Sequence, residues 1–160
     1  MAVEIERKFL VVSDAWRAQA GEGVRYRQGY LTRVHGDCAA RASVRVRIEG
    51  DQARLNIKSA RLGIRRQEYE YAIPLDEAEE MLATLVLGAL VEKTRYRVPV
   101  GKHVWEIDVF EGDNAGLVVA EIELAAEDEA FERPAWLGEE VSDDPRYYNV
   151  CLAEHPYRDW

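Results

Sequence analysis

The chain has 160 residues, a length that suits one domain with a sizeable core. Hydrophobic residues make up 48% of it and charged residues 32%, which is typical of a folded globular protein and excludes a disordered one. The formal net charge of -9 gives a field that repels nucleic acid and anionic membrane, so neither is expected as a partner.

Targeting features and cysteine usage indicate a cytoplasmic protein. The N-terminal segment MAVEIERKFL is charged from its fourth residue and lacks the apolar centre of a signal peptide. No apolar run approaches the roughly 20 residues that a membrane-spanning helix needs. Cys38 and Cys151 form no C-x-x-C pair, which favours reduced thiols in a cytosol.

In chain order, short segments that alternate apolar and polar residues predict eight strands. They lie at about 3–11, 24–33, 43–49, 53–59, 66–73, 92–100, 103–111 and 117–124. Gly50-Asp51 and Gly101-Lys102 suit tight turns between neighbouring strands. Because the connections are mostly short, we expect the strands to pair antiparallel.

Three helical segments are predicted between and after the strands. They span about 14–20, 77–87 and 146–153. Ser13 can cap the first helix, and Asp76 with Glu79 forms an aspartate version of the capping box for the second. Pro145 suits the first position of the last helix.

Like charges recur two residues apart on the predicted strands. Such residues share a face of the strand and lie about 6.6 Å apart. The pairs are Glu4 and Glu6, Arg45 and Arg47, Glu68 and Glu70, Lys93 and Arg95, Glu106 and Asp108, and Glu121 and Glu123. A conventional sheet with its charged face in water is the alternative for any one strand. Like charges side by side are unfavourable, however, so the repeated pairs indicate that groups of opposite charge lie among them.

Eight antiparallel strands can close into a barrel that leaves no free edge. Periodicity alone does not say whether the charged face points inward or outward, but the like-signed pairs favour the inward arrangement. We therefore predict a mainly β (α+β) fold in one domain, 1–160. It is an eight-stranded antiparallel closed β-barrel over about 3–124, with a polar charged lumen, helices packed outside and a C-terminal helical segment over about 128–160.

The charges of such a lumen nearly cancel. The pairs above together with Lys8 and Lys58 give eight negative and six positive groups, or about -2 when all are ionised. Two divalent cations would make the site about +2, which suits a small-molecule polyanion held by side-chain cations and by metal.

The segment Glu4-Ile5-Glu6-Arg7-Lys8 matches the E-x-E-x-K signature of the CYTH superfamily, the triphosphate tunnel metalloenzymes. Further matches follow in order along nearly the whole chain. They are Gln28-Gly29-Tyr30-Leu31, Arg45-x-Arg47, Lys58, Glu68-x-Glu70, Lys93-x-Arg95, Glu106-x-Asp108 and Glu121-x-Glu123. The tail, with Trp136-Leu137-Gly138-Glu139-Glu140-Val141 and Arg146-Tyr147-x-Asn149, resembles the short bacterial tripolyphosphatases of that superfamily.

The resemblance implies a role for each matched residue. The phosphates would be bound by Lys8, Arg45, Arg47, Lys58, Lys93 and Arg95. A divalent cofactor, Mg²⁺ or Mn²⁺, would be bound by Glu4, Glu6, Asp108, Glu121 and Glu123. The candidate catalytic residues are Glu6, Lys8, Glu68 and Glu70, with Glu68 or Glu70 orienting the attacking water.

The activity that the resemblance implies is metal-dependent hydrolysis of inorganic tripolyphosphate to pyrophosphate and phosphate. A nucleoside or thiamine triphosphatase and a class IV adenylyl cyclase are the enzymatic alternatives. A sensor that binds polyphosphate or nucleotide without cleaving it is the non-enzymatic alternative. The full carboxylate set argues against the sensor, because pure anion binding does not need so many negative groups. A homodimer stays open.

Overall fold

The computed structural model describes residues 2–33, 41–61 and 63–160, so Cys38 lies outside the described residues. Its strands are β1 (Val3–Val11), β2 (Val24–Tyr30), β3 (Ala42–Glu49), β4 (Gln52–Ser59), β5 (Arg65–Ile73), β6 (Leu87–Val100), β7 (His103–Phe110), β8 (Val118–Glu123) and β9 (Leu137–Glu140). Its α-helices are α1 (Leu75–Thr84) and α2 (Asn149–Glu154). Four 3-10 helices span Ala15–Gln19, Gly112–Asn114, Pro145–Tyr147 and Tyr157–Asp159.

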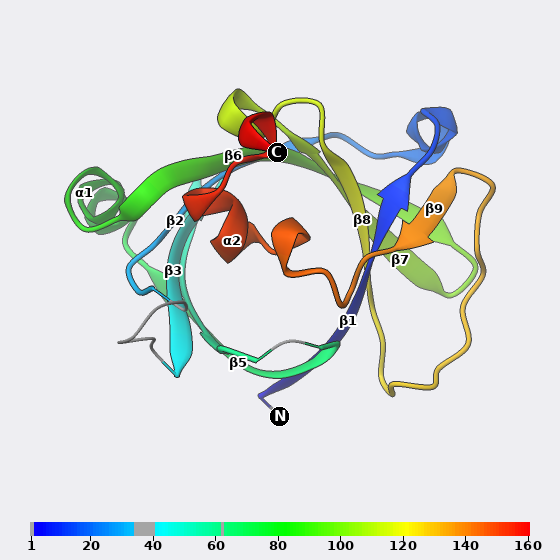
Figure 1. Ribbon diagram of the computed structural model, residues 1–160, viewed down its shortest axis with the longest axis horizontal. Coiled ribbons are helices and arrows are strands. Elements are labelled where there is room, and N and C mark those ends of the chain that lie inside the picture. Colours follow the sequence, from blue (N-terminus) through cyan, green and yellow to red (C-terminus); the bar gives the residue numbers. More distant parts are fainter. Residues whose placement is uncertain (1, 34–40, 62) are drawn as a thin grey trace.

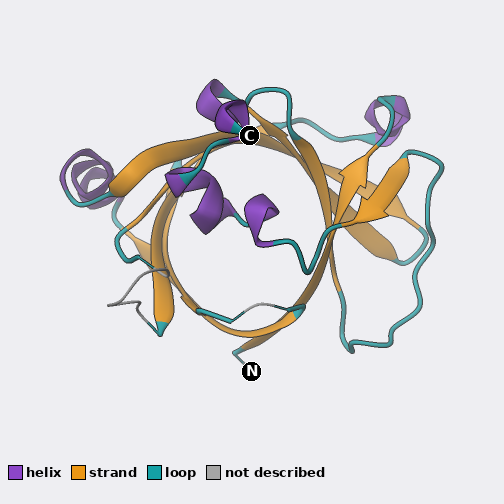
Figure 2. Cartoon of the chain, viewed as in Figure 1, coloured by secondary structure: helices purple, strands orange, loops and turns teal. Residues whose placement is uncertain are grey.

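Eight strands form a closed antiparallel barrel in the order β5-β4-β3-β2-β6-β7-β8-β1 (Figure 1). The ring closes where β1 pairs with β5 over a short register, Val3 opposite Gln67 to Ile5 opposite Arg65. The cartoon in Figure 2 shows strands around the whole ring. The predicted eight-stranded barrel is therefore confirmed. The ninth strand, β9, was not predicted, and it pairs with β1 outside the ring.

Two predicted hairpin turns occur as expected. Gly50 and Gly101 have φ angles of 62° and 60°, in the left-handed region that glycine adopts without steric cost. The strand predicted to start at 92 instead begins at Leu87, because the chain there continues to pair with β2, Leu87 lying opposite Tyr30. The extension shortens the preceding helix.

The three helical segments lie near their predicted places but differ in detail, and the predicted C-terminal helical segment over 128–160 was wrong for its first part, where 128–136 is irregular and Leu137–Glu140 forms β9. Helix α1 begins after Pro74 and has no side-chain cap, so the predicted capping box at Asp76 and Glu79 was wrong. Asp76 lies in the first turn instead, where a negative charge still suits the helix dipole. The segment 14–20 is the short 3-10 helix Ala15–Gln19, whose N-cap residue is Asp14 and makes no side-chain cap. The predicted cap, Ser13, does accept a long hydrogen bond, 3.4 Å, from the Ala15 backbone N–H.

The predicted last helix over 146–153 is broken in two. Pro145 does open a helical turn, and the Asp144 side chain accepts a hydrogen bond from the Arg146 backbone N–H. Tyr148 then takes an extended conformation, with φ -74° and ψ 134°, before α2 begins at Asn149. The Tyr148 hydroxyl donates to the carbonyl oxygen of Ser142 at 2.6 Å, a tertiary contact that a continuous helix would not provide.

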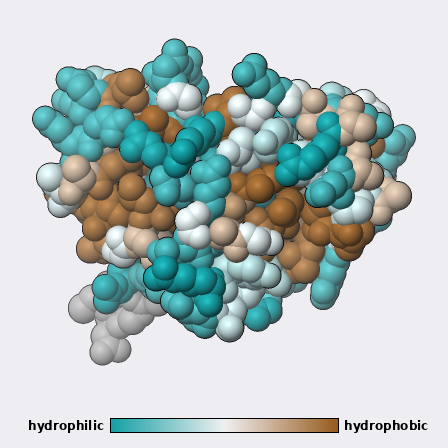
Figure 3. Space-filling view, turned by 90° about the horizontal axis from the view of Figure 1, so that it is seen from above, coloured by the Kyte–Doolittle hydropathy of each residue, from teal (hydrophilic) through white to brown (hydrophobic). Residues whose placement is uncertain are grey.

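The apolar faces of the strands point outward and are covered by the connecting segments. Helix α1 places Ala78 and Leu82 against Val46 and Ile48 on the outside of β3. Around the rest of the ring, Phe9 and Trp105 make an edge-to-face contact at 5.5 Å. Figure 3 shows the barrel wall from the side, with apolar residues gathered on its outer surface between polar areas. No helix in the described ranges is long and apolar enough to cross a membrane.

Helix α2 takes a different position from α1. In Figure 1 it lies within the outline of the ring, together with the 3-10 turn before it. It contacts β6 and β2, and residues 148–150 line the lumen. The prediction of helices packed outside thus describes α1, whereas the C-terminal segment lies across one opening of the barrel.

Candidate active site

The barrel encloses a cavity of about 340 Å³ whose walls are almost entirely charged or polar. All eight barrel strands contribute side chains to it, which is what inward-facing alternate residues require. Of the fourteen charged residues predicted to face the lumen, thirteen line it: Glu4, Glu6, Lys8, Arg45, Arg47, Lys58, Glu68, Glu70, Lys93, Arg95, Glu106, Glu121 and Glu123. The predicted inward arrangement is therefore the one that the chain adopts.

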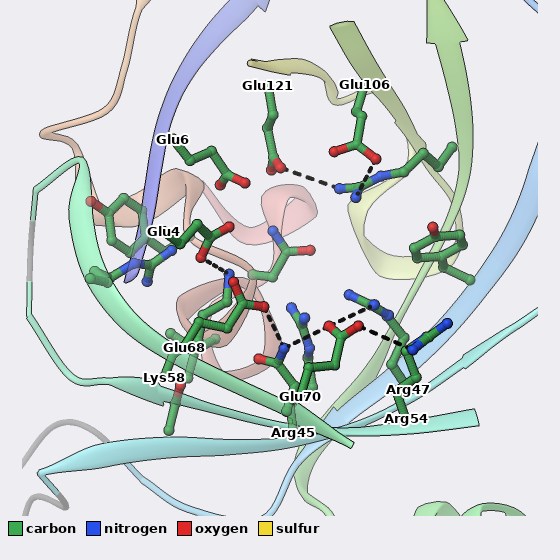
Figure 4. A pocket seen from close by; sticks show the side chains of 18 of the residues that line it. Glu4, Glu6, Arg45, Arg47, Arg54, Lys58, Glu68, Glu70, Glu106 and Glu121 are labelled. Atoms are coloured by element: carbon green, nitrogen blue, oxygen red, sulfur yellow. Dashed lines mark hydrogen bonds and ion pairs between the residues drawn. The ribbon is translucent and has the colours of Figure 1, made fainter. Parts of the chain in front are cut away.

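One side of the cavity, here called the cationic wall, is built by β3 and β4. It consists of Arg45, Arg47, Arg54 and Lys58 (Figure 4). Glu70 of β5 lies between two of these guanidinium groups, with one carboxylate oxygen 3.2 Å from Arg47 Nη2 and the other 3.4 Å from Arg54 Nη1. The Asn56 amide donates to Glu68 at 2.6 Å and to Glu70 at 3.0 Å. The carboxylates of β5 are therefore paired within this wall.

Arg45 forms no salt bridge among the described residues, unlike Arg47, Arg54 and Lys58, although its side chain has a hydrogen bond with Tyr30. Its residue surface is only 7% exposed, and its Nε has no hydrogen-bond partner among the described residues. Leaving a buried charged donor unpaired is costly. A phosphate oxygen supplies the kind of acceptor that this group lacks.

The opposite side, here called the carboxylate wall, is built by β1, β7 and β8. It consists of Glu4, Glu6, Glu106, Glu121 and Glu123, three of which are labelled in a row in Figure 4 (Glu6, Glu121 and Glu106). Glu6 lies directly opposite Glu123 in the β1–β8 pairing, and Glu106 lies opposite Glu121 in the β7–β8 pairing. Negative side chains therefore face one another across both strand pairs.

This crowding changes the acidity of the carboxyl groups. Burial, with the nearby charges of Glu121 and Glu4, raises the pKa of Glu6 to about 8. Burial and the charges of Glu4 and Glu6 likewise raise the pKa of Glu123. Burial opposes ionisation of Glu121 too, but Lys8 and Arg95 outweigh it and hold the pKa of that carboxyl well below its usual range.

Asp108, a predicted metal ligand, does not line the cavity. It is completely buried, and both of its oxygens are occupied by phosphate-binding candidates: Arg95 Nε and Nη2 at 2.7 and 2.8 Å, and Lys93 Nζ at 2.7 Å. Arg95 also extends to Glu106 at 3.1 Å and to Glu121 at 3.2 Å. In this arrangement Asp108 holds Lys93 and Arg95 in place.

Two lysines connect the walls. Lys58 Nζ is 3.0 Å from Glu4, and Lys8 Nζ is 3.4 Å from Glu121. Lys8 also donates to the backbone oxygen of Tyr147 at 3.1 Å. Both ammonium groups therefore lie where the carboxylate wall meets other parts of the lumen.

Several lining residues were not predicted from the sequence. Glu49, Arg54 and Arg66 share strand parity with predicted site residues, and that parity could have identified them. The tail adds Tyr148, Asn149 and Val150. Their only sequence signal is the motif Arg146-Tyr147-x-Asn149, which gives no indication that the segment reaches the lumen.

The donor chemistry of the carboxylate wall fits a divalent cation. No group of three or more His, Cys, Asp or Glu side chains within the described ranges is close enough to hold an ion alone. Mg²⁺ does not require such a group, because it is usually bound by one or two carboxylates together with waters and substrate phosphates. A hard cation would also relieve the repulsion that raises the pKa of Glu6.

Comparison with known proteins agrees with this geometry. Residues 2–148 match the CYTH domain family. An inorganic triphosphatase of Acetivibrio thermocellus is 45% identical over 160 residues, covering 100% of this chain and 99% of the relative. An inorganic triphosphatase of Nitrosomonas europaea is 42% identical over 156 residues, covering 94% and 96%.

Solved structures give the same picture. The crystal structure of an inorganic triphosphatase is 39% identical, with a TM-score of 0.65, and covers 96% of this chain and 95% of that one. A putative adenylyl cyclase from Hippeastrum, described as having a dominant triphosphatase activity, is 17% identical with a TM-score of 0.62. It covers 77% of this chain and 80% of its own, and at that identity the likeness extends to the fold alone.

Proposed function

The chain belongs to the CYTH domain family, and on that premise we propose that it is a divalent-metal-dependent triphosphatase that cleaves inorganic tripolyphosphate into pyrophosphate and phosphate. The observation that carries the proposal is the division of one closed cavity into a cationic wall and a carboxylate wall. A polyanion alone would need only the first. A polyanion with bound metal needs both.

The cations bind and orient the substrate. Arg45, Arg47 and Lys58 contact phosphate oxygens from the cationic wall, and Lys8, Lys93 and Arg95 contact them from the other strands. Arginine is suited to this because its planar fork can bind two oxygens of one phosphate. Asp108 acts indirectly, by fixing the direction of the Arg95 fork.

We assign Glu4, Glu6, Glu121 and Glu123 as the residues that hold Mg²⁺ or Mn²⁺. When bound, the ion supplies positive charge to the phosphate oxygens as the terminal phosphoryl group leaves. The carboxylates position it and must lose their protons to do so, Glu6 above all.

Glu68 is the better of the two candidates for orienting the attacking water. Burial opposes ionisation of Glu68, but its hydrogen bond with Glu4 and the charge of Lys58 lower its pKa, so it is a carboxylate at neutral pH. A carboxylate can accept a hydrogen bond from water. Glu70 already contacts Arg47 and Arg54 through its two oxygens, which makes it a positioning residue for those cations.

A bare anion suits the cavity better than a nucleoside triphosphate does. Val150 is the one aliphatic side chain among the described residues that line it. The Tyr26 ring is already flanked by cations, with Arg95 at 5.1 Å and Arg47 at 5.3 Å. A base or thiazole ring would therefore find little apolar surface. A cytoplasmic location stays a prediction from the sequence.

The test is phosphate release from tripolyphosphate, ATP and thiamine triphosphate, each with Mg²⁺, Mn²⁺ or EDTA. We expect fast, metal-dependent cleavage of tripolyphosphate and slow cleavage of the other two. Preference for ATP or thiamine triphosphate would assign the function to a triphosphate ester instead. Binding without cleavage of any of them would indicate a sensor, unless cyclic AMP formed from ATP reveals a cyclase.

A further inference from the structure

The C-terminal segment connects β1 on one side of the lumen with β6 and β2 on the other through hydrogen bonds. On β1, the backbone N–H of Lys8 donates to Ser142 Oγ at 2.9 Å, and Lys8 Nζ donates to the Tyr147 oxygen at 3.1 Å. On the other side, Lys93 of β6 and Gln28 of β2 both donate to Asn149. The segment therefore contributes a polar surface to the covered end of the cavity.

The orientation of the Asn149 amide is fixed by chemistry. The atom that faces Lys93 Nζ, at 3.0 Å, must be the oxygen, because an ammonium group has donors and no acceptor. The same oxygen accepts from Gln28 Nε2 at 2.8 Å. Lys93 is itself 2% exposed and held by Asp108 at 2.7 Å, so it does not move freely. The Asn149 nitrogen consequently points away from both donors.

Within the described ranges, the Asn149 nitrogen is a donor that no hydrogen bond uses. No described residue accepts a hydrogen bond from Asn149 Nδ2, although the residue is only 9% exposed. The nitrogen is also absent from the buried polar atoms that lack a partner in the described part of the chain, so it retains access to open space. Since Asn149 lines the cavity, that open space is the lumen.

We propose that Asn149 is a substrate-binding residue, whose Nδ2 donates to a phosphate oxygen at the covered end of the tunnel while its Oδ1 holds the Lys93 ammonium beside that oxygen. A neutral donor next to a cation suits a terminal phosphoryl group, which presents several oxygens at one point. The donor adds a hydrogen bond without adding charge that another carboxylate would have to balance. The inference rests on the proposed function only for the identity of the polyanion.

Asn149→Asp and Asn149→Ala separate donation from anchoring. The aspartate keeps an acceptor oxygen for Lys93 and Gln28 but removes both amide hydrogens. Alanine removes both the acceptor oxygen and the donor nitrogen. Hydrogen bonds to charged groups contribute about 1.5–3 kcal/mol, so both variants should weaken tripolyphosphate binding about tenfold to a hundredfold. We expect the melting temperature of Asn149→Asp to stay near that of the wild type, and that of Asn149→Ala to fall.

Asn114 provides the matched control. It lies outside the lumen lining, and its Oδ1 accepts from the Tyr157 backbone N–H at 2.8 Å, so it anchors the same C-terminal segment. Asn114→Ala should lower the melting temperature and leave binding and KM unchanged. Equal loss of binding in Asn114→Ala and Asn149→Ala would overturn the proposal, because anchoring would then explain the effect.

Binding is measured by calorimetry with tripolyphosphate in metal-free and Mg²⁺ buffers, and KM and kcat by phosphate release. Wild-type binding by Asn149→Asp overturns the proposal. Wild-type binding by Asn149→Ala also overturns the proposal, even if Asn149→Asp binds poorly. In that case the weak binding of Asn149→Asp would come only from repulsion between the aspartate charge and the phosphate. If the wild type binds but does not cleave, the proposed function fails while the comparison of variants still decides the role of Asn149. If it does not bind, both fail.

Discussion

The two walls of the tunnel use the same residue, glutamate, in opposite ways. Beside the cationic wall, Glu49 and Glu68 are half-buried, and neighbouring cations and hydrogen bonds hold the pKa of each below its usual value. In the carboxylate wall, burial and like charges raise the pKa of Glu6 and of Glu123. Cations and hydrogen-bond donors of the protein already neutralise the first pair, whereas Glu6 and Glu123 form no salt bridge among the described residues, and the charges of Lys58 and Lys8 do not offset the effect of burial and like charges on Glu6.

This difference separates motifs that look identical in the sequence. The E-x-E triplets at Glu4 and Glu6 and at Glu68 and Glu70 have the same spacing on strands of similar length. Cations of β3 and β4 surround the second triplet. In the first triplet, Glu4 pairs with Lys58, but Glu6 faces the carboxylate of Glu123 on β8. The lesson is that neighbours on adjacent strands decide whether a carboxylate is available for metal.

The largest expected effect is that of Glu6→Gln in the carboxylate wall. It removes a proposed metal ligand, so kcat/KM for tripolyphosphate should fall by about 10²–10³, the usual effect of losing one electrostatic contact to a transition state. The fold should persist, because a pKa of about 8 keeps the Glu6 carboxyl protonated in the metal-free folded chain at neutral pH, and glutamine has nearly the same shape and no charge. Circular dichroism and a metal titration are the checks. Normal turnover in this variant would rule out the metal assignment.

Arg45→Lys is the corresponding change in the cationic wall. Lysine keeps the charge but loses the planar fork, so we expect a higher KM and a lower kcat, with kcat/KM down by about tenfold or more. Arg17→Lys is the control, since Arg17 lies outside the lumen lining. If Arg45→Lys behaves like this control, Arg45 does not bind phosphate through its fork.

Glu68→Gln and Glu70→Gln test the division of labour inside the cationic wall. The first should lower kcat by about 10²-fold, the lower range for a residue that assists proton transfer. The second should chiefly raise KM, because it releases Arg47 and Arg54 from a shared carboxylate. Steady-state kinetics for both variants give the comparison. The opposite pattern would make Glu70 the residue that orients water.

The smallest expected effect is on the pH dependence of stability without metal. The pKa of Glu6 is about 8 in the folded chain and near 4.5 when unfolded, so the folded state holds a proton that the unfolded state has lost. Stability is therefore highest below the unfolded pKa and falls as pH rises towards 8. Between pH 5.5 and 7.5 the melting temperature in EDTA should drop by roughly 5 °C.

Two variants of that experiment sharpen the assignment. Burial lowers the pKa of Lys93 to about 8, which gives the opposite trend only above pH 8 and therefore outside the chosen window. Glu106 and Glu123, whose pKa is also raised, act in the same direction as Glu6, so the Glu6 variant is needed to separate its share. Glu6→Gln should flatten the slope of the melting temperature against pH in EDTA. Adding Mg²⁺ should reverse it, because metal binding is favoured as the carboxyl loses its proton. An unchanged slope in Glu6→Gln would show that Glu6 does not cause it.

Much of the barrel could be predicted because its signals are local. The alternation of apolar and polar residues along β1 or β7 defines both faces of the strand from a few adjacent residues. A turn such as Gly50-Asp51 is indicated by the glycine, which can adopt the positive φ that the turn requires. The strand β9 was missed because it has only four residues, too few for a period to show. The break at Tyr148 was missed because it depends on a contact with Ser142 and not on helix propensity.

By itself, the sequence determined which side chains share a face of each strand, and hence that thirteen of the predicted residues enter one lumen. It did so because strand parity is a property of adjacent residues. Only the tertiary structure decided which carboxylates are neutralised, that Asp108 accepts hydrogen bonds from Arg95, and that Asn149 comes within reach of Lys93. Those outcomes depend on distances between residues far apart in the chain, and electrostatic interactions follow distance in space rather than position in sequence.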